Sequence, residues 1–107
     1  MLNAQCSIQT YKGGTNLIKI TISEGRIAAT GHAGAGPRGR DLVCAGVSVL
    51  LSTLAEYLAE VRARELTVKL DPGDGEISAS NHEEAFTLIA AGLRLLEECY
   101  PACIKIV

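Results

Sequence analysis

The chain has 107 residues, of which 48% are hydrophobic and 21% are charged, and its formal net charge is −2. This length suits one compact domain with a real core. The lack of a basic excess argues against direct binding of nucleic acid. No apolar run reaches the ~18 residues that span a bilayer, so we expect no membrane partner. The N-terminus does not resemble a signal peptide either, and the predicted location is the cytoplasm.

The first predicted elements form a β-hairpin followed by a loop. The stretch Leu17 to Ile22 (LIKITI) alternates and is rich in β-branched residues, which indicates a strand. A tight turn over residues 23–25 leads to a return strand over residues 26–31. The segment from His32 to Arg40 is too rich in glycine for a helix or strand, and Pro37 adds a break. We therefore expect this segment to be a loop.

Asp41 begins a predicted long helix that runs to about Ala63. Aspartate is a preferred N-cap residue, because its carboxylate accepts hydrogen bonds from the unpaired N–H groups of the first turn. The helix is apolar around most of its circumference, whereas a helix that covers one face of a sheet needs only an apolar stripe. The surplus predicts a second buried face, and hence a homodimer.

The second half of the chain repeats the pattern of hairpin and helix. Residues 66–70 (LTVKL) alternate as a strand, and the Asp-Pro-Gly-Asp-Gly sequence at 71–75 is typical of a turn before a short partner strand at 76–79. Ser80-Asn-His-Glu matches a capping box, which predicts a second helix from there to Cys99. Residues 103–107 (CIKIV) form the last predicted strand.

The predicted order is ββαββαβ, which indicates an α/β (α+β) fold: a two-layer sandwich with a mainly antiparallel sheet and two helices. We assign residues 17–107 to this single domain and residues 1–16 to an N-terminal extension. Residues 7–11 (SIQTY) would suit an edge strand. Alternatively, residues 12–14 (KGG) can be encoded by a bacterial ribosome-binding sequence and Leu17 by a TTG start codon. On that hypothesis the natural chain begins near Leu17, which the intact mass would test.

The segment from Gly31 to Ser48 allows three interpretations. The sequence GAGPRG (34–39) fits the G-x-G-x-x-G pattern of a dinucleotide-binding turn, but Asp41 would repel a phosphate there and the chain is short for such a domain. In a structural interpretation, His32 is a loop residue and Cys44 a core residue. In the third, Cys44 is a nucleophile and His32 its base.

The third interpretation has local physical support. If Asp41 is the N-cap, Cys44 lies in the first helical turn, where unpaired N–H groups and the helix dipole stabilise a thiolate. Backbone N–H groups nearby would serve as an oxyanion hole. Ser48 lies one turn further along the same face. Asp41 either caps the helix alone or also orients His32. His82 is interpreted as solvated, and Glu83 and Glu84 as favourable first-turn charges.

The stretch GHAGAGPRGRDLVCAGVSVL (31–50) resembles the signature of the ribosomal-processing cysteine protease (Prp, or YsxB-like) family. The matching positions are Gly31, His32, Ala33, Gly39, Asp41, Val43, Cys44, Ala45, Val47 and Ser48. The element order from Leu17 to Val107 resembles the family as well. Family members usually start near the position of Leu17, so the departure lies in residues 1–16.

The resemblance implies a homodimeric bacterial cysteine endopeptidase with Cys44 as nucleophile and His32 as general base. Such an enzyme removes a short N-terminal extension from a large-subunit ribosomal protein, cutting after an aromatic residue, and is needed for ribosome assembly. Asp41 and Ser48 match motif positions and would support the pair. The glycine-rich loop would order around the peptide, and we assign its substrate contacts to Gly34, Gly36, Arg38 and Gly39.

The four cysteines suggest no metal site or cofactor. Cys99 and Cys103 form a C-x3-C without a second compact pair, so we interpret both as buried thiols. Two other functions stay open. A ribosome-associated binding protein without activity would bind the peptide and not cleave it. A thiol redox protein would need Cys6, Cys99 or Cys103 to approach Cys44 in space.

Overall fold

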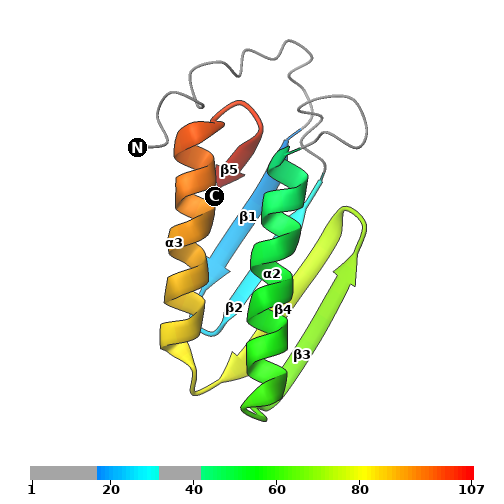
Figure 1. Cartoon of the computed structure of the whole chain (residues 1–107), viewed down its shortest axis with the longest axis vertical. Helices are drawn as coiled ribbons and strands as arrows, with labels where there is room; N and C mark the ends of the chain where they lie inside the picture. The colour runs from blue at the N-terminus through cyan, green and yellow to red at the C-terminus, as the bar shows by residue number, and fades with distance from the viewer. Residues whose placement is uncertain (1–16, 32–41) are drawn as a thin grey trace.

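The structure, a computed structural model, describes residues 17–31 and 42–107. In these ranges two helices lie against one sheet (Figure 1). The elements, in chain order, are β1 (Ile18–Ser23), β2 (Arg26–Thr30), α2 (Leu42–Glu60), β3 (Arg64–Asp71), β4 (Asp74–Ser80), α3 (Glu83–Cys99) and β5 (Ile104–Ile106). The predicted order ββαββαβ is therefore confirmed.

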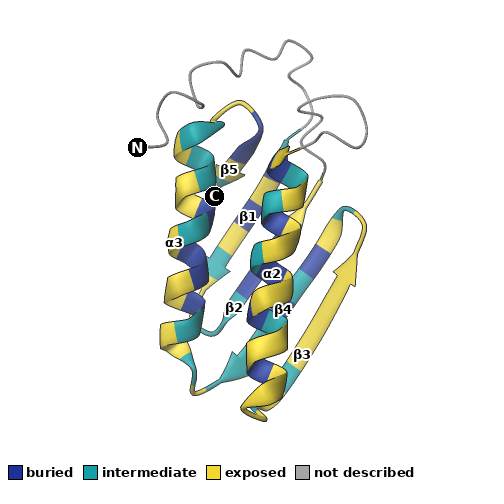
Figure 2. Ribbon diagram, viewed as in Figure 1, coloured by how far each residue is buried: buried dark blue, intermediate teal, exposed yellow. Residues whose placement is uncertain are grey.

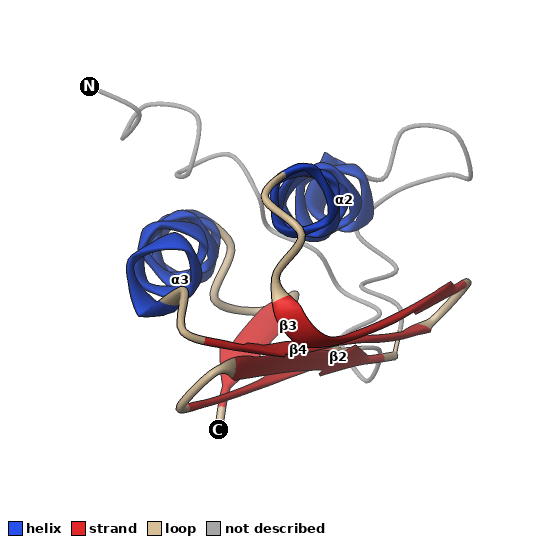
Figure 3. Ribbon diagram, turned by 90° about the horizontal axis from the view of Figure 1, so that it is seen from below, coloured by secondary structure: helices blue, strands red, loops and turns tan. Residues whose placement is uncertain are grey.

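The sheet has the strand order β3-β4-β2-β1-β5. Neighbouring strands in the sheet are antiparallel except for β1 and β5. These two strands pair in parallel, with Ile18 opposite Ile104. Both helices cover the same face, as Figure 3 shows. The structure is thus the two-layer sandwich with a mainly antiparallel sheet that the sequence predicts.

The core lies between the helix layer and the sheet (Figure 2). Ile20, Ile27 and Ile77 are fully buried on the helix side of the central strands. Along each of these strands buried residues alternate with more exposed ones, so one face of the strand packs against the helices and the other faces away from them. This alternation explains why the hairpins could be predicted from the sequence.

The helix α2 covers the sheet with one side. Its buried residues recur at the spacing of a single helical face, and they are Val43, Val47, Leu51, Leu54 and Leu58. By length and composition alone, α2 is also long and apolar enough to cross a membrane. The expectation that no apolar segment would reach that length is therefore wrong. The regular buried face is nevertheless that of a helix packed on a sheet.

The helices α2 and α3 pack closely through two glycines. A Cβ atom on Gly46 would lie 3.1 Å from Leu96 Cδ1, and one on Gly92 would lie 2.9 Å from Leu50 Cδ2. Each leucine therefore occupies the space that a side chain on the opposing helix would need. The pairing of 46 with 96 and of 50 with 92 also shows that the helices are antiparallel.

The helix α2 ends at Glu60, three residues before the predicted end. The N–H of Ala63 donates to the carbonyl of Leu58 at 2.9 Å, and that of Arg62 to the carbonyl of Ala59 at 3.1 Å. Arg62 has a φ of 54°. This is a Schellman cap, in which a residue in the left-handed conformation stops the helix. Glycine usually occupies that position, so the sequence gives no signal for this end.

The predicted capping box at the start of α3 is wrong. The helix begins at Glu83 with His82 as N-cap residue, and no side chain caps it. Ser80 is instead the last residue of β4, and its hydroxyl donates to the Glu65 carboxylate. Asn81 follows with a φ of 65° and turns the chain towards the helix. Ser80 therefore completes the sheet rather than the helix.

The cysteines differ in their surroundings. Cys103 is 1% exposed, which confirms the prediction that it packs in the core. Cys99 is half-buried and disulfide-bonded, so the expectation of a buried thiol is wrong for this residue. Cys44 is half-buried near the start of α2 and packs against the core.

Candidate active site

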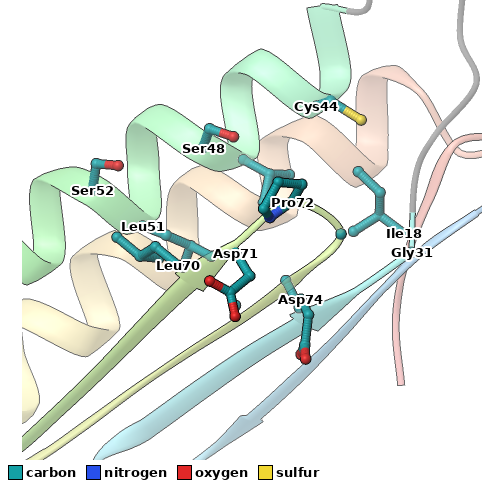
Figure 4. Close-up of a pocket in the computed structure, with 14 residues that line it drawn as sticks. Ile18, Gly31, Cys44, Ser48, Leu51, Ser52, Leu70, Asp71, Pro72 and Asp74 are labelled. Carbon is teal, nitrogen blue, oxygen red and sulfur yellow. The ribbon is translucent and has the colours of Figure 1, made fainter.

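Cys44 is the third residue of α2, in its first turn. Its neighbours Val43 and Val47 are buried against the sheet, which places the thiol at the margin of the buried face. Figure 4 shows the Cys44 Sγ directed towards Ile18 and Gly31 rather than along the helix. The thiol therefore faces the point where the ends of β1 and β2 meet the start of α2.

A hollow of about 440 Å³ lies beside Cys44. One wall is α2, which contributes Cys44, Val47, Ser48, Leu51 and Ser52. The second is the tip of the β3–β4 hairpin, residues 70–75, and the end is closed by Ile18, Ala29 and Gly31. A half-buried thiol at the wall of such a hollow can reach a bound molecule while the sheet holds its helix in place.

Ser48 and Ser52 lie along the same wall as Cys44. The three side chains come from successive turns of α2, spaced by four residues (Figure 4). Both serines are exposed and line the hollow. They also line a second, shallower hollow that continues along α2 to Glu60. The helix thus presents one continuous row of small polar side chains that begins at the thiol.

Gly31 joins the end of β2 to the hairpin tip. Its N–H donates to the carbonyl of Gly73 at 3.0 Å. Its φ is 99°, and a Cβ here would collide with the carbonyl oxygen of Leu17, so glycine is required. The backbone immediately before residue 32 is therefore held beside the hollow.

The charged groups near the hollow belong mainly to the other face of the sheet. Lys69 Nζ lies 2.8 Å from Asp74 Oδ2, and this pairing raises the pKa of Lys69. Arg26 Nε lies 2.7 Å from Glu76 Oε2, and that hydrogen bond lowers the pKa of Glu76. Both pairs are well exposed, so they contribute little to stability.

The structure brings together only part of the predicted site. Cys44 and Ser48 line the same hollow. The predicted base His32, the supporting Asp41 and the predicted loop contacts lie outside the described residues; these contacts are Gly34, Gly36, Arg38 and Gly39. His82 lies at the other end of α2, half-buried, with its ring 6.2 Å from that of Tyr57 in an edge-to-face arrangement. The interpretation of His82 as solvated is therefore corrected.

Sequence reasoning missed the contribution of the hairpin tip. The sequence at 71–75 indicates a turn, but its proximity to Cys44 depends on the pairing of β4 with β2, which no local pattern reveals. Ser52 was missed as well, although its spacing of eight residues from Cys44 places it on the same helical face.

Comparison with known proteins identifies a family and a fold. The model of the cysteine protease Prp family matches residues 17–105. Among curated proteins, no relative matches the chain.

Three solved structures show the same fold. One is the essential ribosomal processing protease Prp from S. aureus with a covalently linked product peptide. It matches with a TM-score of 0.71 and 23% sequence identity, and the match covers 86% of this chain and 97% of that chain. A second holds the S. aureus protease with a substrate peptide. Its TM-score is 0.68 and its sequence identity 20%, and the match covers 87% of this chain and 98% of that chain. The third is SMU.848 from Streptococcus mutans. Its TM-score is 0.65 and its sequence identity 25%, and the match covers 88% of this chain and 93% of that chain.

The family match covers the sheet, both helices and the hollow beside the thiol. Because it extends over most of the chain, this protein belongs to the cysteine protease Prp family.

Proposed function

We propose that this protein is a cysteine endopeptidase that removes a short N-terminal extension from a bacterial large-subunit ribosomal protein, cutting after an aromatic residue. The observation that carries the proposal is the position of Cys44, in the first turn of α2 and at the wall of a hollow. The helix N-terminus stabilises a thiolate there. The family match supports the reaction class.

In the proposed mechanism, His32 accepts the thiol proton and Cys44 Sγ attacks the carbonyl carbon of the scissile bond. Backbone N–H groups at the start of α2 stabilise the oxyanion. The proton held by His32 passes to the leaving amine, which leaves a thioester on Cys44. Water, deprotonated by His32, then hydrolyses the thioester and restores the thiol. Asp41 orients His32, and Ser48 supports the thiol from the next turn.

The segment 32–41 is proposed to supply the remaining substrate contacts through Gly34, Gly36, Arg38 and Gly39. Its two flanking residues support this, since Gly31 lines the hollow and Leu42 begins the helix that carries Cys44. The S. aureus protein of the same fold holds a substrate peptide in one structure and a covalently linked product peptide in another. A peptide is therefore the substrate class we propose for this chain.

We also propose that the protein acts as a homodimer. The helix layer leaves large apolar side chains in contact with solvent, and the most exposed are Leu42, Val49, Leu88 and Leu95. A second copy that covered them would remove this apolar surface from water. Sedimentation of a monomer at micromolar concentration would contradict the proposal.

The proposed location is the cytoplasm, where ribosomal proteins are made, and the natural domain is proposed to begin near Leu17. Cys99 is disulfide-bonded in the structure, whereas most cytoplasmic thiols are kept reduced, so the oxidation state of Cys99 in the cell is a test of this location. Alkylation of the protein in intact cells, followed by mass measurement, would show whether Cys99 is oxidised there and where the chain begins.

The deciding experiment incubates the protein with a peptide in which a Phe pair precedes the expected cleavage site. We expect cleavage after the second Phe by the native protein and none by Cys44→Ala. Cleavage that survives Cys44→Ala would refute the nucleophile. Binding of the peptide without cleavage by the native protein would favour a ribosome-associated binding protein instead.

A further inference from the structure

The hairpin tip forms the wall of the hollow that faces α2. Residues 70–75 line it, opposite Cys44, Ser48 and Leu51. Two strand pairings fix this tip, because β4 pairs with β2 on one side and with β3 on the other. The hydrogen bond from Gly31 to Gly73 adds a third attachment. The tip is therefore attached to the sheet on both sides and to Gly31.

Leu70 is the large apolar side chain of this wall. It pairs with Gly75 in β4, and a Cβ on Gly75 would lie 3.3 Å from Leu51 Cδ1 and 3.6 Å from Leu70 Cδ2. Both leucines therefore lie over the glycine and form one apolar surface, as Figure 4 shows. Leu51 is buried, but Leu70 is 43% exposed.

Asp71 and Asp74 also line the hollow, but their carboxylates do not lie on the apolar surface formed by Leu51 and Leu70. Asp71 and Asp74 pair with each other across the hairpin, one position beyond Leu70 and Gly75, so they belong to the opposite face of the sheet. In Figure 4 their carboxylates point away from α2. Lys69 also binds Asp74 on that face. The side chains of the tip that face α2 are thus the apolar Leu70 and Pro72.

A solvent-exposed leucine that lines the same hollow as the thiol gains stability when an apolar group of a bound molecule covers it. We infer that Leu70 is a specificity-determining residue that contacts the side chain of the substrate residue before the scissile bond. This inference rests on the proposed function for the identity of the peptide. It assigns the preference for an aromatic residue to the surface formed by Leu70 and Leu51.

Val68 provides a matched control on the same strand. It lies two residues before Leu70, on the same face of β3, and is 44% exposed against 43% for Leu70. Among the described residues that line the hollow, Val68 does not occur. Truncation of either side chain removes a similarly exposed apolar group from β3, so a difference between the two variants reports on the hollow.

The experiment measures peptide binding by calorimetry in a Cys44→Ala background, so that no turnover occurs. Two peptides are compared that carry either Phe or Ala before the expected scissile bond. With Leu70 present we expect the Phe peptide to bind about tenfold more tightly. Leu70→Ala removes most of this preference, Leu70→Met preserves it because the side-chain volume is similar, and Val68→Ala leaves it unchanged.

Two results would overturn the inference. One is a preference for Phe that persists in Leu70→Ala. The other is a preference that falls equally in Leu70→Ala and Val68→Ala. Neither of these binding results tests the proposed protease activity, which fails only if the native protein does not cleave the Phe peptide. A native protein that binds this peptide through Leu70 without cleaving it would retain the specificity surface and lose the proposed reaction.

Discussion

Substitution of Gly92 by alanine tests how α2 and α3 are held together. In an unobstructed helix this change stabilises by about 1 kcal/mol, because alanine has the higher helix propensity. Here the new Cβ would lie 2.9 Å from Leu50 Cδ2 and 3.1 Å from Leu50 Cδ1. Both distances are shorter than the ~3.5 Å of a favourable carbon contact. The Leu50 side chain must turn or the helices must separate.

The expected cost follows from these two opposing effects. Overpacking of a well-packed site costs about 1–3 kcal/mol, and the helix propensity of alanine offsets about 1 kcal/mol of it. We therefore expect Gly92→Ala to destabilise the protein by about 1 kcal/mol. Leu50→Ala removes the obstructing methyl groups, so Gly92→Ala in that background should stabilise by about 1 kcal/mol. The coupling between the two positions is then about 2 kcal/mol.

Urea denaturation of the native protein, both single variants and the double variant would measure this coupling. The four proteins should have the same m-value, so that their midpoints compare directly. A double variant whose change in free energy equals the sum of the two single changes would refute the close contact. So would a Gly92→Ala variant that is more stable than the native protein.

Three further predictions follow from the described residues. Arg62→Gly should raise the free energy of unfolding by about 0.5–1 kcal/mol in a denaturation experiment, because Arg62 has a φ of 54°; a loss of stability would contradict the Schellman cap. Because the hydrogen bond from Arg26 lowers the pKa of Glu76, Arg26→Gln should raise that pKa towards its ordinary value in an NMR titration of the carboxyl, and the small stabilisation by the pair should be lost as the pH falls through the pKa of Glu76. A Glu76 pKa that does not change in Arg26→Gln would contradict the pairing. Iodoacetamide should modify Cys44 at neutral pH while Cys103, which is 1% exposed, reacts only after unfolding; equal rates would contradict both placements.

The sheet could be predicted from the sequence because its strands alternate. Ile18 and Ile20 in β1, and Ile27 and Ala29 in β2, are buried in the predicted pattern. Helix ends were harder to predict. The end of α2 is set by Arg62 in a conformation that usually needs glycine, so the sequence carries no local signal for it.

The start of α3 shows the opposite error, in which a good local signal is overruled. Ser80 has the position of a capping residue, but its place in β4 and its hydrogen bond to Glu65 engage it in the sheet. The residues of the site also fall into a group that the sequence predicts and a group that it does not. Cys44 and Ser48 follow from helical periodicity. The wall that contains Leu70 follows only from the pairing of distant strands, which the sequence does not show.

The position of the thiol depends on packing that lies outside the hollow. Val43 and Val47, on either side of Cys44, are buried against the sheet, and Gly46 lies against Leu96 of α3. The first two turns of α2 are thus held by the sheet on one side and by α3 on another. The opposite wall is fixed independently by the strand pairings of the hairpin. A displacement of α2 relative to the sheet would therefore change the width of the hollow without unfolding the protein. For this reason Gly92→Ala, which has no contact with the hollow in the described part of the chain, should weaken peptide binding as well as stability.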